Sequence, residues 1–116
     1  MQTVLVTGAG GFIGKTLVGA LSRAGLRVVG LFRDISEEFR FDKGRLLRRT
    51  VAVFGDVADR DGFSRVLADY DVDAVIHLAA HSAVKKCEED PWSAYRTNVM
   101  GVVSLLDACR LRHRDR

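Results

Sequence analysis

Short apolar runs alternate with helical spacings along this chain. Four runs have the length and composition of β-strands, at residues 3–7, 27–32, 50–54 and 74–78. Helical spacings of apolar residues separate the first run from the second and the third run from the fourth. This alternation predicts an α/β fold, Rossmann-like, with a parallel sheet. Right-handed crossovers then place the strands in the spatial order 3-2-1-4, with helices on both faces of the sheet.

Two aspartates mark the expected beginnings of helices. Asp59 can cap a helix after the third strand. The buried face of that helix is expected to carry Phe63, Val66, Leu67 and Tyr70. Asp90 and Pro91 suit the cap and first turn of a long helix. The apolar positions of that long helix are Tyr95, Val99, Val102, Val103 and Leu106. Residues 34–49 lack a clean spacing, and a short irregular helix with loops is expected there.

Closely spaced glycines turn the first strand directly into the first helix. Gly8 permits a tight turn, Gly11 lets a pyrophosphate approach the backbone, and Gly14 lets helix and strand pack closely. The following helix presents free N–H groups and the positive end of its dipole to phosphates. The sequence therefore predicts a nucleotide site at this turn, against the alternative of a plain glycine-rich connection.

Composition narrows the class of protein. The chain has 116 residues, 47% of them hydrophobic and 28% charged, which fits one globular domain. No long apolar stretch or signal-like segment is evident, so we expect a soluble, cytoplasmic protein without a membrane role. Cys87 and Cys109 lack metal-ligand spacing and are expected to be reduced thiols, with no metal bound. A net charge of +3 without a recognised motif does not favour nucleic acid as a partner.

The glycine turn also carries a family resemblance. Its glycines are spaced three and three, Thr7 precedes them, and Phe12 and Ile13 lie inside the motif. The stretch resembles the extended short-chain dehydrogenase/reductase family, of the epimerase/dehydratase type, and the resemblance covers nearly the whole chain. It implies that residues 1–116 form an NAD(P)-binding Rossmann domain. It further implies that the turn residues contact the cofactor; these are Gly8, Gly11, Phe12, Ile13 and Gly14.

The resemblance also places the cofactor's adenosine half. The family's acidic position at the end of the second strand falls on Phe32, and Arg33 follows where NADP-preferring relatives often carry arginine. Arg33 can grip a 2′-phosphate, which favours NADP, although Asp34 one residue later could still serve NAD. Asp56 matches the position that meets the adenine amine, with Val57 contacting the ring. The alternative for Asp56 is a turn aspartate that caps its own backbone.

The remaining expected cofactor positions lie in two segments. The fourth-strand segment resembles the family motif in which small residues admit the cofactor's ribose and nicotinamide side; its positions are Leu78, Ala79, Ala80 and Ser82. Sugar-nucleotide epimerases often carry lysine at the Ser82 position, which weakens assignment to that subgroup. His77 and His81 have no obvious catalytic partner and are expected to be structural or surface residues. Asn98 matches an asparagine that supports the family's active site, with a local backbone contact as the alternative.

The family's proton-transfer pair is missing from these residues. Tyr70 is followed four positions later by Ala74 and Tyr95 by Val99, so no tyrosine has the required lysine. We therefore expect no catalytic residue and no activity from this chain alone. The domain is expected to be truncated, with the substrate region absent and a nucleotide-sugar substrate met only in a fuller protein. Its open sheet edge and uncovered apolar helix face invite self-association. The resemblance implies the NAD(P)-binding portion of a nucleotide-sugar epimerase/dehydratase or reductase, which exchanges hydride with its bound cofactor. A non-catalytic NAD(P)-binding or interaction module is the alternative function.

Overall fold

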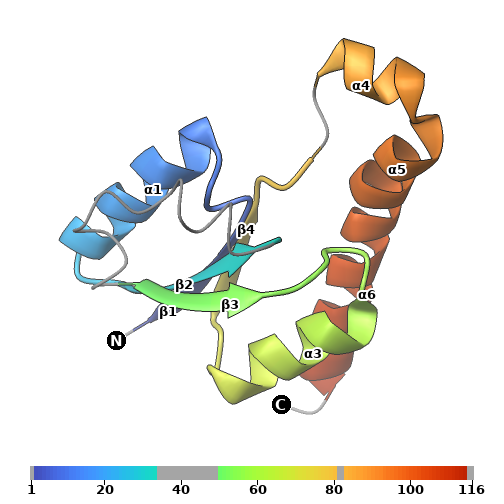
Figure 1. The fold of residues 1–116 in the computed structure, drawn as a ribbon. Coiled ribbons are helices and arrows are strands. Elements are labelled where there is room, and N and C mark those ends of the chain that lie inside the picture. The colour runs from blue at the N-terminus through green and yellow to red at the C-terminus, as the bar shows by residue number, and fades with distance from the viewer. Residues whose placement is uncertain (1, 34–49, 81–82, 115–116) are drawn as a thin grey trace.

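A computed structural model describes residues 2–33, 50–80 and 83–114. Four parallel strands, β1 (Thr3–Thr7), β2 (Arg27–Phe32), β3 (Thr50–Phe54) and β4 (Ala74–His77), form one sheet in the order β3-β2-β1-β4 (Figure 1). The predicted strand order is confirmed, and the fourth strand ends one residue earlier than expected. The predictions for residues 34–49, for His81 and for Ser82 lie outside the described residues.

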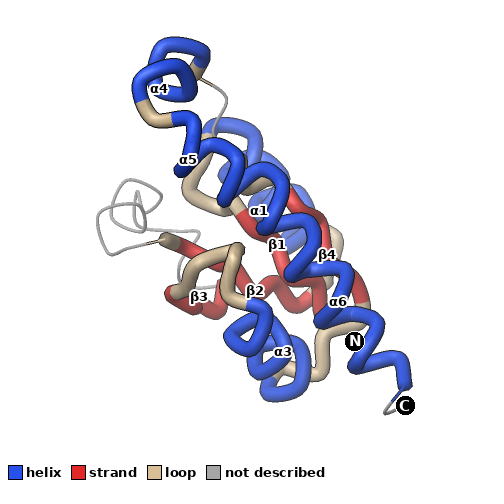
Figure 2. Tube along the Cα trace, turned by 90° about the vertical axis from the view of Figure 1, so that its right-hand side faces the viewer, coloured by secondary structure: helices blue, strands red, loops and turns tan. Residues whose placement is uncertain are grey.

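Helices cover both faces of this sheet, as predicted. Helix α1 (Phe12–Arg23) lies on one face, and α3 (Arg60–Asp69) packs with α6 (Gly101–Arg114) on the other (Figure 1). A short helix α4 (Val84–Glu89) precedes α5 (Pro91–Tyr95), which continues through a π-helical turn, η2 (Arg96–Met100), into α6. Figure 2 shows α5, this turn and α6 as one continuous rod that passes beside the sheet. No helix in the described part is long and apolar enough to cross a membrane.

Alternation along the strands builds two separate cores. Val4 and Val6 point to the α1 side, whereas Leu5 between them points to the α3 and α6 side. The α1 core is made of Val4, Val6, Ala9, Val18, Val28 and Phe32. The other core is made of Leu5, Val29, Leu31, Val57, Phe63, Leu67, Val72, Leu105 and Ala108. The sheet is therefore buried on both faces, as a parallel sheet requires.

Both predicted helix caps are present. The Asp59 carboxylate accepts a hydrogen bond from the Gly62 amide at 3.1 Å, and Asp90 accepts from the Ser93 amide at 3.3 Å. Each carboxylate satisfies an amide that the first helical turn leaves without an intrahelical partner. These caps fix where the chain turns from the sheet into α3 and from α4 into the long rod.

The long rod exposes an apolar face. Trp92, Tyr95 and Leu106 are 77%, 68% and 63% exposed, and Val99, Val102 and Val103 are exposed beside them. The buried face of α6 carries smaller side chains, with Ser104 and Ala108 packed near Leu105. Strand β4 pairs with β1 on one side, and no described strand pairs with its other side. The expected uncovered helix face and open sheet edge are therefore both present in the described part.

Candidate functional site

The turn between β1 and α1 is built from backbone packed against backbone. Gly8 has a φ of +67°, and a Cβ there would lie 2.8 Å from the Ala79 amide nitrogen. A Cβ on Gly14 would lie 2.2 Å from the Gly8 carbonyl oxygen, well inside contact distance. No side chain caps α1, which begins after Gly11. The turn thus brings uncapped helix amides to its surface, the arrangement that binds anions in other proteins.

A buried threonine joins the ends of β1 and β4 beneath this turn. The Thr7 hydroxyl oxygen accepts hydrogen bonds from the Leu78 and Ala79 amides at 3.1 and 3.2 Å. The Thr7 hydroxyl also lies 2.6 Å from His77 Nδ1. With its oxygen already accepting two hydrogens, the hydroxyl donates its own hydrogen to that nitrogen. Thr7 therefore orients the backbone that leaves β4 and holds it against Gly8.

His77 is a structural histidine in this arrangement. Because Nδ1 accepts from Thr7, the neutral ring carries its proton on Nε2. That Nε2 atom is buried and has no hydrogen-bond partner among the described residues. Burial also lowers the pKa of the His77 ring below its usual value, which favours the neutral ring. The expectation that His77 is not a catalytic base stays a prediction.

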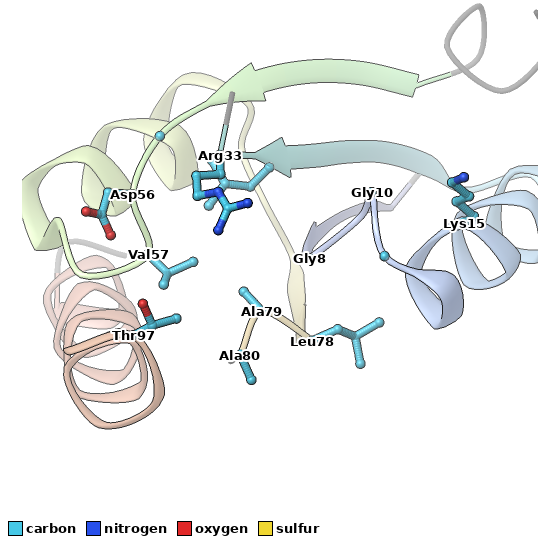
Figure 3. A pocket seen from close by; sticks show the side chains of 13 residues that line it. Gly8, Gly10, Lys15, Arg33, Asp56, Val57, Leu78, Ala79, Ala80 and Thr97 are labelled. Carbon is cyan, nitrogen blue, oxygen red and sulfur yellow. The ribbon is translucent and has the colours of Figure 1, made fainter. Parts of the chain in front are cut away.

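The carboxyl ends of the strands open into a cleft of about 440 Å³. Eight of the residues predicted to bind a cofactor line it: Gly8, Gly11, Arg33, Asp56, Val57, Leu78, Ala79 and Ala80. Figure 3 shows Arg33, Asp56 and Val57 on one side of this space and Leu78, Ala79 and Ala80 on another, at the ends of different strands. The volume lies within the roughly 300–1,000 Å³ typical of small-molecule sites. The strand order reverses at β1, with β2 on one side and β4 on the other. Open α/β sheets bind ligands at the carboxyl ends of the strands beside such a reversal.

The cleft has further lining residues that the sequence analysis did not single out. They are Gly10, Lys15, Leu31, Gly55 and Thr97. Lys15 lies one residue after the glycine motif on the first turn of α1, so the motif itself could have drawn attention to it. No local signal marks Thr97, because its place at the cleft depends on how the long rod packs. Besides Arg33, Lys15 is a second positive residue in the lining, at the edge of the cleft far from Asp56.

The end of β2 separates a core residue from a cleft residue. Phe32 is fully buried in the α1 core, and its ring contacts Phe54 with centroids 6.3 Å apart. Arg33, the next residue, is exposed and lines the cleft. The side chain at the end of β2 that lines the cleft is therefore Arg33 and not Phe32.

Asp56 is held from two sides. Its Oδ1 accepts from the Ala58 amide at 2.9 Å, and its Oδ2 accepts from Arg96 in the π-helical turn at 2.5 Å. Burial acts to raise the pKa of Asp56, but the Ala58 amide and the Arg96 guanidinium outweigh burial and lower it. Asp56 therefore bonds the backbone of its own turn, which was one of the two roles expected from the sequence. It also lines the cleft as an ionised group, which the other expected role, contact with an adenine amine, requires.

Some predicted site residues do not place their side chains in the cleft. Phe12 and Ile13 begin α1 with their side chains 92% and 67% exposed. Gly14 lies behind the turn, where it supports Gly8 rather than lining the space. Asn98 is exposed on the π-helical turn, whereas its neighbour Thr97 lines the cleft. No group of metal-ligating side chains able to hold an ion occurs within residues 2–33, 50–80 and 83–114.

The residues present fit a dinucleotide. The glycine turn leaves no room for side chains and offers uncapped amides, which suits a pyrophosphate. Positive groups at Lys15 and Arg33 suit further phosphate charge, and the ionised Asp56 suits an amine donor. Small side chains at Ala79 and Ala80 leave space along the β4 side.

Comparison with known proteins agrees with this geometry. Residues 4–116 match the model of the NAD dependent epimerase/dehydratase family. The chain is 35% identical over 113 residues to UDP-glucuronate 4-epimerase 4 of Arabidopsis thaliana, covering 93% of this chain and 26% of that protein.

Solved structures with the same fold include epimerases that hold NAD. A UDP-glucose 4-epimerase from Brucella ovis in complex with NAD superposes with a TM-score of 0.80 and 36% identity, over 96% of this chain and 33% of that one. A UDP-glucose-4-epimerase from Stenotrophomonas maltophila with bound NAD and formylated UDP-arabinopyranose gives 0.83 and 30%, over 95% and 34%. The chain thus spans about a quarter to a third of the length of these relatives. It belongs to the NAD dependent epimerase/dehydratase family, and the resemblance to the extended short-chain dehydrogenase/reductases is confirmed.

Proposed function

We propose that this chain binds a nicotinamide adenine dinucleotide in the cleft at the carboxyl ends of its strands. The observation that carries the proposal is convergence: the glycine turn, Arg33, Asp56 and the segment 78–80 line one cleft. In this proposal the α1 amides and Gly11 receive the pyrophosphate. Asp56 and Val57 receive the adenine, and Leu78, Ala79 and Ala80 lie along the ribose and nicotinamide side. Phe12 and Ile13 take part through their backbone amides.

For the choice between the two cofactors, we propose NADP on the strength of Arg33. An exposed guanidinium at the end of β2 can hold a 2′-phosphate through charge-assisted, bidentate hydrogen bonds. The two epimerase structures described above hold NAD. NAD and NADP differ only in the 2′-phosphate, so the rest of the proposed binding mode is the same for either cofactor. The preference therefore rests on one side chain and can be tested there.

Isothermal titration calorimetry with NAD and NADP tests both statements on the 116-residue chain. We expect saturable binding of one dinucleotide per chain, with NADP the tighter ligand. Arg33→Ala should weaken NADP binding about tenfold and NAD binding less than twofold, because only the 2′-phosphate contact is lost. Arg23→Ala is the matched control, since Arg23 ends α1 away from the cleft.

Two results would count against the proposal in different ways. No binding of either dinucleotide at millimolar concentration would contradict the proposed function. Equal weakening of NAD and NADP in Arg33→Ala would contradict only the preference for NADP.

The associated chemistry is proposed for a protein of the relatives' length. There, the bound cofactor would exchange hydride with a nucleotide sugar, while the present residues bind and orient the cofactor. Asn98 would support an active site completed by other residues, and Ser82, which lies outside the described residues, stays a predicted cofactor contact. Neither tyrosine in these 116 residues precedes a lysine at the family's spacing, so we expect no turnover by them alone. The same observation favours a second candidate, a non-catalytic dinucleotide-binding module.

A further inference from the structure

The loop after β3 is fastened to the long rod at three successive residues. Asp56 pairs with Arg96. Val57 packs against Gly101 so closely that a Cβ there would lie 2.9 Å from Val57 Cγ2. The Ser104 hydroxyl donates to the Ala58 carbonyl at 3.0 Å. One wall of the cleft is therefore a unit made of the β3 loop and the rod.

The contact nearest the cleft is made from the π-helical turn. Arg96 is the first residue of this turn, and Thr97 next to it lines the cleft. Figure 3 shows Asp56, Val57 and Thr97 at one end of the cleft, away from Gly10 and Lys15 at the other. Turns of this kind interrupt α-helices frequently at functional sites. Here the turn carries both the partner of Asp56 and a lining residue.

Arg96 holds one oxygen of a half-exposed carboxylate. Asp56 and Arg96 are each 46% exposed at the side chain, so packing alone does not fix them. The Ala58 amide fixes one carboxylate oxygen and Arg96 fixes the other. Each oxygen retains a lone pair that can accept a further hydrogen. The group thus stays oriented and still able to accept a hydrogen bond from a ligand.

We propose that Arg96 is a positioning residue for purine recognition: it holds the Asp56 carboxylate where that group accepts from the exocyclic amine of an adenine nucleotide. This inference rests on the proposed dinucleotide function and deepens it. Arg96 acts through Asp56 and does not itself touch the base. Its contribution is therefore to selectivity for a 6-amino purine.

A pair of nucleotides separates this role from a structural one. Adenosine monophosphate carries an amine at position 6 of the base, whereas inosine monophosphate carries a carbonyl oxygen that Asp56 would repel. We expect the chain to bind the adenine nucleotide about tenfold more tightly, as expected for one charge-assisted hydrogen bond. Arg96→Leu should reduce this ratio to about twofold, since the carboxylate is then held only through the Ala58 amide.

The experiment also includes a variant of Asp56, the double variant and a control variant on the same rod. Asp56→Ala should also lose the ratio, and adding Arg96→Leu to it should change nothing further, since the two residues act as one unit. Arg110→Leu is the matched control: Arg110 lies on the same rod and pairs with Asp107, away from the cleft. Its ratio should equal that of the unmodified chain. Thermal unfolding of each variant shows that the fold is retained, and Arg96→Gln replaces Arg96→Leu where the latter does not fold.

The outcomes distinguish this inference from the function on which it rests. If the unmodified chain binds neither adenosine monophosphate nor NAD, the proposed function fails. If the chain prefers the adenine nucleotide and Arg96→Leu or Arg96→Gln keeps the full preference, the positioning role is overturned while dinucleotide binding stands. Loss of the preference in Arg96→Leu but not in Arg110→Leu supports it.

Discussion

The two ends of the cleft are built on different principles. At the glycine turn, backbone packs on backbone and a fully buried Thr7 fixes the geometry. At the opposite end, half-exposed side chains of Asp56 and Arg96 meet across a loop and a helix. The geometry of the first end depends on volume, whereas the Asp56–Arg96 contact at the second end depends on charge. Stability should therefore respond mainly to substitutions at the glycine turn, and ligand selectivity mainly to substitutions at the Asp56 end.

The strongest test of this contrast is Gly14→Ala. The added methyl group would lie 2.2 Å from the Gly8 carbonyl oxygen and must displace the turn. We expect a loss of about 3 kcal/mol or more in the free energy of unfolding, measured by urea denaturation followed by circular dichroism. Gly55→Ala is the control: its methyl would lie 3.4 Å from Leu31, an ordinary contact, so a loss below about 1 kcal/mol is expected. Equal losses in the two variants would contradict the steric argument.

Thr7→Val tests the hydrogen bonds under the turn. The change keeps the shape but leaves the Ala79 amide and His77 Nδ1 without their partner. A loss of about 2–3 kcal/mol in unfolding free energy is expected. Thr50→Val is the matched control, because the hydroxyl of this buried strand threonine has no hydrogen-bond partner among the described residues. Removing it should be neutral or slightly stabilising. A large loss there would show that exchanging a buried hydroxyl for a methyl group is costly even without a hydrogen bond, and the Thr7 result could then not be assigned to its hydrogen bonds.

The depressed pKa of His77 predicts a pH dependence of stability. The unfolded chain takes up a proton near the ordinary pKa of 6.5, while burial makes the folded chain resist it. Stability should therefore decrease as the pH falls from above 6.5 to below it. His77→Asn keeps an acceptor for the Thr7 hydroxyl but does not titrate, so urea midpoints at pH 7.5 and pH 5.5 should differ less than in the unmodified chain. An unchanged difference would assign the pH dependence to other groups.

The smallest effect on stability is expected at the other end of the cleft. Arg96→Leu breaks an exposed ion pair, and such pairs contribute roughly 0–1 kcal/mol. The same denaturation assay used for Gly14→Ala should show a loss below about 1 kcal/mol. A loss comparable to that of Gly14→Ala would mean that both ends support the fold, and the contrast between them would disappear.

The same contrast explains what could be predicted from sequence. The helix caps and the glycine turn follow from local spacing, because Asp59 and Asp90 each bond an amide three residues on and Gly14 packs against Gly8 and Ala9. The strand order follows from the alternation of strands and helices with right-handed crossovers. The Arg96–Asp56 pair joins positions 40 residues apart, and no local sequence pattern predicts this contact. For Asn98 and Thr97, periodicity within an ordinary α-helix could not decide which faces the cleft. The π-helical turn changes the phase of the rod at that point.

The hydrogen bond between Thr7 and His77 has a consequence for the order of folding. It spans 70 positions of the chain, so the floor of the cleft cannot close until β4 has docked beside β1. A folding chain that has assembled only β1, α1 and β2 already has the glycine motif but has no complete place for a ligand. A ligand that needs the whole cleft would bind only the fully folded chain and draw the folding equilibrium toward it. The cofactor would then stabilise the fully folded chain and would not stabilise partly folded chains.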